Sequence, residues 1–144
     1  INGLCLKESE ALDVGQVRAM LDGDSTAAQD EGSLVTELCG KMRSQGLRPK
    51  TIVDYTREPF VFAPGNVRIT LDYNIRTGMQ DTDFLNPDSV TVSAGDAPII
   101  LEVKWDELLP SYIRGQLELD SLQWTAFSKY YLCRKYNCYG GVRI

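Results

Sequence analysis

The sequence predicts an α+β fold built around an antiparallel sheet, and three observations predict it. Apolar residues follow helical spacing in residues 14–23 and 33–46. A period-two pattern then runs through residues 51–76, and helical spacing returns in residues 125–136. Parallel βαβ units would require strands that alternate with helices along the whole chain, and this sequence lacks that order. With 144 residues, the chain has the length of a single domain.

The first two helices carry start and stop signals. Asp13 with Gln16 three residues later matches a capping box, in which each residue satisfies a free amide of the other. Ser33 is expected to cap the second helix, and Gly46 is expected to end it. Residues 2–8, which precede both helices, are expected to form a short strand.

The central part of the chain predicts a strand meander. Residues 51–62 form the first alternating stretch, and residues 63–66 contain the Pro-Gly-Asn signal of a turn. Residues 67–76 give the clearest strand. A long loop over residues 77–97 leads to a last strand at residues 98–105. In the clearest strand, one face is expected to be apolar and packed, with Val67, Ile69, Leu71, Tyr73 and Ile75.

Two helices are expected after the sheet. Pro110 suits the first turn of one of them, with Ile113 and Leu117 on its core side. Residues 125–136 predict the C-terminal helix, and Trp124, Phe127 and Tyr131 are expected to be core residues. The segment after residue 136, which includes Gly140 and Gly141, is expected to be a loose tail.

Composition excludes several classes of function. No apolar run approaches the about 20 residues of a membrane helix, so no membrane span is expected. The net charge of −5 argues against general nucleic-acid binding. Histidine is absent, which removes the commonest general base and zinc ligand. The four cysteines form no C-x-x-C pair, which favours reduced thiols and a cytoplasmic setting. Any chemistry must use the remaining polar side chains or a bound metal.

The basic residues are unevenly placed, and several fall within the predicted strands. The charged residues that could act together are the cations Arg57, Arg68, Arg76, Lys104 and Lys129 and the carboxylate Glu102. One interpretation is a solvated sheet face, and Lys129 on a helix would by default face solvent. The other is a closed sheet with a charged interior, in which guanidinium and ammonium groups bind a polyanion such as a phosphate chain. A carboxylate among these cations then suits Mg²⁺ or Mn²⁺, and Glu102 is the candidate.

Several blocks resemble the VTC domain, named for the vacuolar transporter chaperone polyphosphate polymerases. They are LRPKTIVDYTRE (residues 47–58), NVRITLD (66–72), NIRTG (74–78), ILEVK (100–104) with the following Leu109-Pro110, and AFSKY (126–130) with Cys133-Arg134. The resemblance implies a triphosphate tunnel metalloenzyme, which is an antiparallel β-tunnel with a basic interior, helices packed outside and a C-terminal helix. It implies a phosphotransferase that transfers the γ-phosphoryl group of ATP onto polyphosphate with divalent Mn or Mg.

The resemblance also assigns roles to individual residues. Arg57 and Arg68 would be tunnel arginines that grip phosphate, and Glu102 would bind the metal. Lys129 would contact phosphate at the tunnel end. Lys104 and Tyr55 match less closely, as a catalytic cation and a substrate contact, and Arg76 is a further substrate-binding candidate. Lys7 lies where a tunnel lysine could fall, without a firm motif around it.

The family's domain extends further on the N-terminal side than this chain does. Residues 1–144 are therefore expected to be the C-terminal portion of a single VTC-like domain, with an open tunnel unless a partner chain supplies the missing strands. The parent domain is expected to be an enzyme, although this portion alone could be inactive. Two alternatives to the polymerase stay open: a tunnel triphosphatase, and a non-catalytic module that binds polyphosphate or another anion.

Overall fold

The computed structural model describes residues 8–24, 26, 33–117 and 124–139. The chain divides into two compact units, residues 1–50 and residues 51–144, and each is described by itself. The strand expected at residues 2–8 lies almost entirely outside the described residues, as do Lys7, Gly140 and Gly141.

The first unit contains two helices, α1 (Val14–Leu21) and α2 (Leu34–Gln45). The predicted capping box is present, because the Asp13 carboxylate accepts from the Gln16 amide at 2.8 Å and the Gln16 side chain accepts from the Asp13 amide at 3.0 Å. Ser33 caps α2 by accepting from the Thr36 amide. Gly46 ends α2 in the left-handed region at φ 67°, where an L side chain would be strained. The helix signals in the sequence are thus confirmed.

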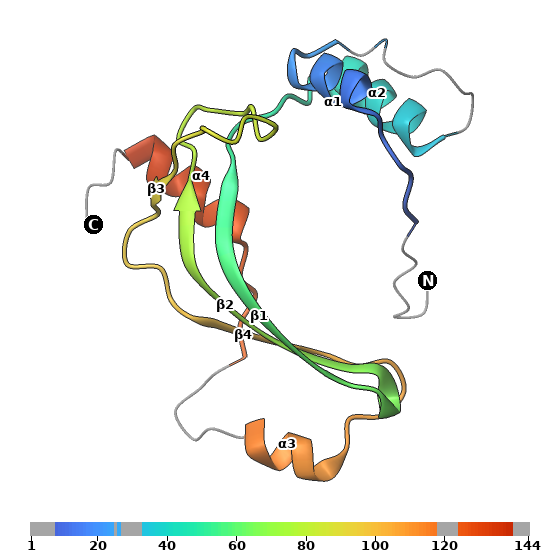
Figure 1. Cartoon of the computed structure of the whole chain (residues 1–144), viewed down its shortest axis with the longest axis vertical. Helices are drawn as coiled ribbons and strands as arrows, with labels where there is room; N and C mark the ends of the chain where they lie inside the picture. Colours follow the sequence, from blue (N-terminus) through green and yellow to red (C-terminus); the bar gives the residue numbers. More distant parts are fainter. Residues whose placement is uncertain (1–7, 25, 27–32, 118–123, 140–144) are drawn as a thin grey trace. The chain divides into compact units, whose positions relative to one another are not determined.

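The second unit contains an open antiparallel sheet of four strands: β1 (Val53–Phe62), β2 (Val67–Thr77), β3 (Val92–Ser93) and β4 (Ile100–Lys104). β1 and β2 form a long hairpin closed by a 3-10 turn, η1 (Pro64–Asn66). β2 is central, since β1 pairs with one side of it and β3 and β4 pair with the other. Figure 1 shows β1 and β2 as a long twisted pair. The predicted α+β class and meander are confirmed, and β3 is a strand within the expected loop.

A β-bulge in β2 changes which side chains share a face. Thr56 pairs with Tyr73 and Asp54 pairs with Arg76, so two residues of β2 lie opposite one residue of β1. Asn74 in the bulge has φ 52°, a left-handed conformation that asparagine tolerates better than most residues. The side-chain alternation therefore reverses at this point of the strand.

The predicted packed face of β2 is confirmed in part, because Val67 and Ile75 are buried and its other three members are not. The buried residues of the strand are Val67, Thr70, Asp72, Ile75 and Thr77, whereas Ile69, Leu71 and Tyr73 are only half-buried. The bulge brings Ile75 and Thr77 to the face that carries Thr70 and Asp72, and Asp72 is covered there by Arg57 and Lys129. Strict alternation along residues 67–76 could not reveal the bulge.

Two helices follow the sheet, α3 (Ser111–Leu117) and α4 (Lys129–Tyr139). Figure 1 shows α4 beside β1 and β2. A core forms there from Ile75, Ala94 and Cys133, with Val53, Tyr55, Ala97, Ile100 and Leu132 packed against it.

Within the described residues, α4 begins later than the sequence predicts. Trp124 is 83% exposed and Tyr131 67% exposed, so these two are not the core residues expected, and Phe127 is also exposed. The reason is the helix start at Lys129, which places Cys133 instead of the aromatic residues on the packed side. No helix in the described part of the chain is long and apolar enough to cross a membrane.

Candidate functional site

The charged side chains predicted to act together lie mainly on one face of the sheet. Arg57 on β1 pairs with Asp72 on β2. Two residues along β2, Thr70 lies opposite Glu102 on β4, and Arg68 lies opposite Lys104. Directly opposed residues in antiparallel strands project to the same face. We call this surface the charged face; it comprises Arg57, Arg68, Thr70, Asp72, Glu102 and Lys104, together with Tyr55 and Lys129 beside them.

Asp72 is the centre of the charged face and is fully buried. Arg57 holds it with two hydrogen bonds, from Nε to Oδ1 at 2.6 Å and from Nη2 to Oδ2 at 2.7 Å. Lys129, the first residue of α4, contacts the second oxygen at 2.6 Å. The Arg57 hydrogen bonds, with Lys129, outweigh the cost of burial and lower the pKa of Asp72 to about 2. Asp72 is therefore a carboxylate at neutral pH.

Glu102 lies at the more open side of this cluster, with its side chain 35% exposed. Lys104 Nζ is 2.8 Å from Oε1, and Arg57 Nη2 is 3.5 Å from Oε2. The hydrogen bond from Lys104 is the main reason that the pKa of Glu102 is lowered, and burial opposes it. Glu102 is thus a second ionised carboxylate on the charged face, held less tightly than Asp72.

The Tyr55 ring separates the charged face from the apolar core under α4. Lys129 Nζ lies 4.8 Å from the ring centroid and Arg57 Cζ lies 5.4 Å from it, within the range of cation–π attraction. The ring also packs against the core of the second unit. Tyr55 therefore helps to position two cations, and its role as a substrate contact stays a prediction.

The two remaining arginines differ in position. The Arg68 side chain is exposed and makes no hydrogen bond or ion pair with the residues that the structure describes. Arg76 lies beyond the bulge, paired with Asp54, and its side chain donates to Thr91 Oγ1 at 2.8 Å and to the Thr91 carbonyl. Because alternation reverses at Asn74, Arg76 is on the opposite face from Asp72. The structure thus brings Arg57, Arg68, Lys104, Lys129, Tyr55 and Glu102 together and leaves Arg76 apart.

Comparison with known proteins gives one clear result. The family model described as VTC domain matches residues 3–137, which is most of the chain. The chain belongs to the VTC domain family. This membership confirms the resemblance and connects the protein with polyphosphate in general terms. Comparison with curated proteins and with solved structures gave no significant match.

The donor set of this VTC domain fits a divalent metal only through Glu102. In the described part of the chain, no group of three or more Asp, Glu, Cys or His side chains is placed to hold an ion. Mg²⁺ is nevertheless often held by one or two carboxylates, with phosphate oxygens and water completing its shell. Glu102, with 35% of its side chain exposed, suits that role better than the fully buried Asp72, although Lys104 and Arg57 contact its two oxygens.

Asp72 and Thr70 are site residues that the sequence reasoning missed. Both belong to the polar face of their strand, which the sequence left open as solvated or interior, and both are buried, with Asp72 at 0% and Thr70 at 3% exposure. A usable signal did exist for Asp72, because it shares strand parity with Arg68 in the block that resembles the family. An acidic residue among inward-facing cations is expected to pair with them.

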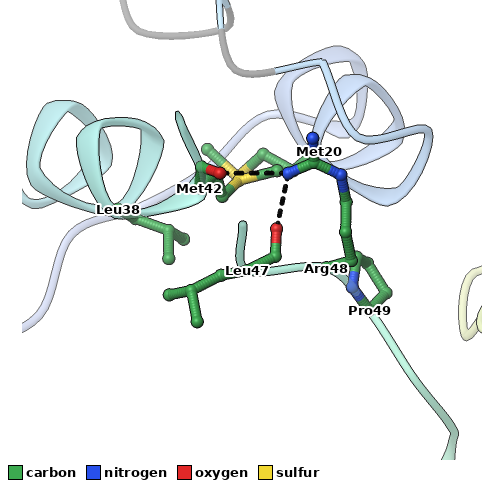
Figure 2. Close-up of a pocket in the computed structure, with 6 residues that line it drawn as sticks. All are labelled: Met20, Leu38, Met42, Leu47, Arg48 and Pro49. Carbon is green, nitrogen blue, oxygen red and sulfur yellow. Dashed lines mark hydrogen bonds between the residues drawn. The ribbon is translucent and has the colours of Figure 1, made fainter. Parts of the chain in front are cut away.

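The first unit has a separate hollow of about 250 Å³. Figure 2 shows the Arg48 guanidinium at its edge, donating from Nη1 to the carbonyls of Met42 and Leu47. The lining is otherwise apolar: Met20, Leu38, Met42, Leu47 and Pro49. It offers no carboxylate and no uncommitted cation, so its chemistry does not suit a phosphate chain.

Proposed function

We propose that the chain is part of a polyphosphate polymerase domain, which transfers the γ-phosphoryl group of ATP onto a polyphosphate chain. Membership in the VTC domain family supports a connection with polyphosphate. The observation that carries the proposal is the charged face, where Arg57, Lys104 and Lys129 pair with two carboxylates and Arg68 lies on the same face without an ion-pair partner among the described residues. Phosphoryl transfer can rely on cations and positioning without histidine, which this sequence lacks.

The four cations would have two different roles in the site. Arg68 and Lys104 are the most available for a phosphate chain, since Arg68 has no ion-pair partner among the described residues and Lys104 is 67% exposed. Arg57 and Lys129 form ion pairs with Asp72 and would be the rigid, positively charged part of the site. Rigid, pre-oriented cations stabilise the charge of a transition state without reorganising at the moment of reaction.

Glu102 would hold the divalent metal, together with phosphate oxygens. When bound, such an ion neutralises negative charge on the transferring phosphoryl group. The chain's own contribution is to keep Glu102 ionised, which the neighbouring Lys104 ensures by lowering the pKa of Glu102.

The open sheet would be one wall of a tunnel. β1 has β2 on one side and no described strand on its other side. Further strands, from the same protein or from a partner chain, would pair with this edge and enclose the charged face. In this proposal, residues 1–144 are the C-terminal portion of a single domain.

Product analysis tests the activity. The protein is incubated with ATP and Mn²⁺, and both polyphosphate and orthophosphate are measured. Growth of polyphosphate chains supports the polymerase. Release of orthophosphate without chain growth would instead identify a triphosphatase, and salt-sensitive binding of polyphosphate without turnover would identify a binding module.

Two variants sharpen this test. Glu102→Ala is expected to abolish the metal-dependent turnover while polyphosphate still binds. Arg68→Ala is expected to weaken anion binding in all three cases. If Arg68→Ala left anion binding unchanged, the premise that the charged face binds phosphate would fail.

A further inference from the structure

Thr70 lies in the middle of the charged face and has an unsatisfied hydroxyl. Its residue is 3% exposed, and its Oγ1 atom has no hydrogen-bond partner in the described structure. Buried polar groups are nearly always hydrogen-bonded, and one that is not calls for an explanation such as a ligand. A hydroxyl can both donate and accept, so it suits a phosphate oxygen as well as a carboxylate.

The neighbours of Thr70 explain why the hydroxyl lacks a partner. On β1 it lies opposite Pro59, whose side chain has no polar atom. On β4 it lies opposite Glu102, but the two oxygens of Glu102 contact Lys104 and Arg57 instead. Along the face its polar neighbours are Asp72, which is occupied by Arg57 and Lys129, and Arg68, whose exposed side chain makes no hydrogen bond with the described residues.

Among the residues that the structure describes, one ion pair crosses β2 at this position. Arg57 comes from β1 and Glu102 comes from β4, the strands on opposite sides of β2, so their contact passes over the central strand near Thr70. This contact is long, at 3.5 Å, whereas Arg57 is 2.6 Å from Asp72. Charge-assisted hydrogen bonds are usually about 2.7–2.9 Å, so the Arg57–Glu102 contact is the weaker of the two.

We propose that a bound phosphate chain separates Arg57 from Glu102 and accepts a hydrogen bond from the Thr70 hydroxyl. This inference rests on the proposed function and adds Thr70 to its binding residues. A phosphate oxygen attracts Arg57 Nη2 and Lys104 Nζ, and it repels Glu102, so it weakens both contacts that now hold Glu102. Arg57 keeps its hydrogen bonds to Asp72 and stays in place. The hydroxyl of Thr70, which has no partner to lose, is then uncovered for the ligand.

The test removes the hydroxyl without changing the shape of the side chain. Thr70→Val deletes the donor, Thr70→Ser retains it, and Thr56→Val serves as the matched control. Thr56 is also on the β1–β2 hairpin, is exposed and, because it pairs with Tyr73, lies on the face opposite to Arg57. Binding of tripolyphosphate is measured by calorimetry without metal, and the unfolding temperature of each variant is measured in the absence of ligand.

The proposal predicts that Thr70→Val binds tripolyphosphate more weakly although its unfolding temperature is not lowered. Thr70→Val is expected to weaken tripolyphosphate binding about tenfold, because a hydrogen bond to a charged group is lost. Its unfolding temperature is expected to stay equal or rise, because an unsatisfied buried hydroxyl has been removed. Thr70→Ser and Thr56→Val are expected to bind within about twofold of the unchanged protein.

Three results separate this inference from the function on which it rests. Binding by Thr70→Val equal to that of the unchanged protein would overturn the role of Thr70. Equal weakening in Thr70→Val and Thr70→Ser, or weakening with a lower unfolding temperature, would show a packing role and overturn it too. Arg68→Ala with unchanged tripolyphosphate binding would overturn the charged face as a phosphate site, whatever Thr70 does.

Discussion

Asp72 shows at the scale of one residue how the charged face can be stable without a ligand. Cations gathered on one sheet face repel one another and lose hydration, so they need negative partners. Asp72 supplies a fully buried carboxylate to Arg57 and Lys129, and the pair from Arg57 is bidentate. This arrangement holds two cations in position while Arg68 and Lys104 stay more exposed.

The first prediction concerns acid stability. The pKa of Asp72 is lowered to about 2 in the folded protein, against about 3.9 in an unfolded chain. A lowered carboxyl pKa contributes stability that is fully present above the unfolded pKa and is lost as the pH falls through the folded pKa. We expect about 2 kcal/mol of the free energy of unfolding to disappear between pH 5 and pH 2 from this group. Urea unfolding followed by circular dichroism across that range measures it.

Asp72→Asn is the matched variant for acid stability. At pH 7 it is expected to unfold about 2–3 kcal/mol more easily, because Lys129 loses its carboxylate partner and Arg57 keeps the longer contact with Glu102. The difference from the unchanged protein should shrink as the pH approaches 2, where Asp72 itself becomes protonated. A difference that stayed constant down to pH 2 would mean that the pKa of Asp72 is not lowered in the folded protein.

The second prediction compares two arginines of the same face. Arg68→Ala should cost little stability, within about 0.5 kcal/mol, because Arg68 is exposed and makes no ion pair with the described residues. Arg57→Ala should cost more, since it leaves Asp72 with Lys129 as its remaining partner. Both should weaken tripolyphosphate binding. Urea unfolding measures the free energy of unfolding of both variants. Equal values for Arg57→Ala and Arg68→Ala would mean that the ion pair of Arg57 with Asp72 does not stabilise the fold.

At the scale of elements, three side chains of α4, spaced four residues apart, form an ion pair or hydrogen bonds with β2. Lys129 contacts Asp72, Cys133 Sγ donates to the Arg76 carbonyl at 3.5 Å, and Asn137 bonds to Thr77. Residues four apart lie on the same side of a helix. The bulge at Asn74 is the matching feature of β2, because it brings Asp72 and Thr77 to one face.

The third prediction tests this attachment at the end farthest from the charged face. Asn137 accepts from Thr77 Oγ1 at 3.0 Å and donates to the Met79 carbonyl at 2.7 Å. Asn137→Ala should lower the free energy of unfolding by about 1–3 kcal/mol, because the buried Thr77 hydroxyl and the carbonyl of the half-buried Met79 each lose a partner. Urea unfolding measures this loss. Lys135→Ala, an exposed position of the same helix, is the control and should change stability by less than about 0.5 kcal/mol.

The helix and strand boundaries show which elements a sequence alone can predict here. Asp13, Ser33 and Gly46 are local signals, and the helices that they delimit are present. The start of α4 was not predicted, because the spacing of Trp124, Phe127 and Tyr131 looks helical although two of them are largely exposed. The bulge was also missed, since it depends on how β1 and β2 pair and not on either sequence alone.

At the scale of the whole molecule, the family and the α+β class could be predicted from separate short blocks. Four of these blocks supply the strands and the helix that carry Arg57, Arg68, Glu102 and Lys129. The central role of Asp72 could not be predicted, because it depends on three elements meeting at one carboxylate. The sheet that the structure describes is open, and its closure into a tunnel stays a prediction.

The fourth prediction concerns that outer edge of β1. In an antiparallel strand, alternate amides point toward each neighbour, so half of the β1 amides bond to β2 and the others face away. If further strands complete a tunnel, the outward amides should also be protected in the protein that carries this chain. Hydrogen exchange followed by NMR is expected to show both sets slowed by at least about a hundredfold. Long unpaired edges also invite aggregation, which is a physical reason to expect a partner for this one.

Residues 1–144 on their own provide the comparison for this measurement. There the inward amides of β1 should stay protected by β2, and the outward amides should exchange much faster, because no described strand pairs with them. Rapid exchange of the outward set in the complete protein as well would contradict closure and would favour an open anion-binding sheet. Protection of both sets in residues 1–144 alone, with a mass that doubles at higher concentration, would instead show that a second copy supplies the missing neighbour.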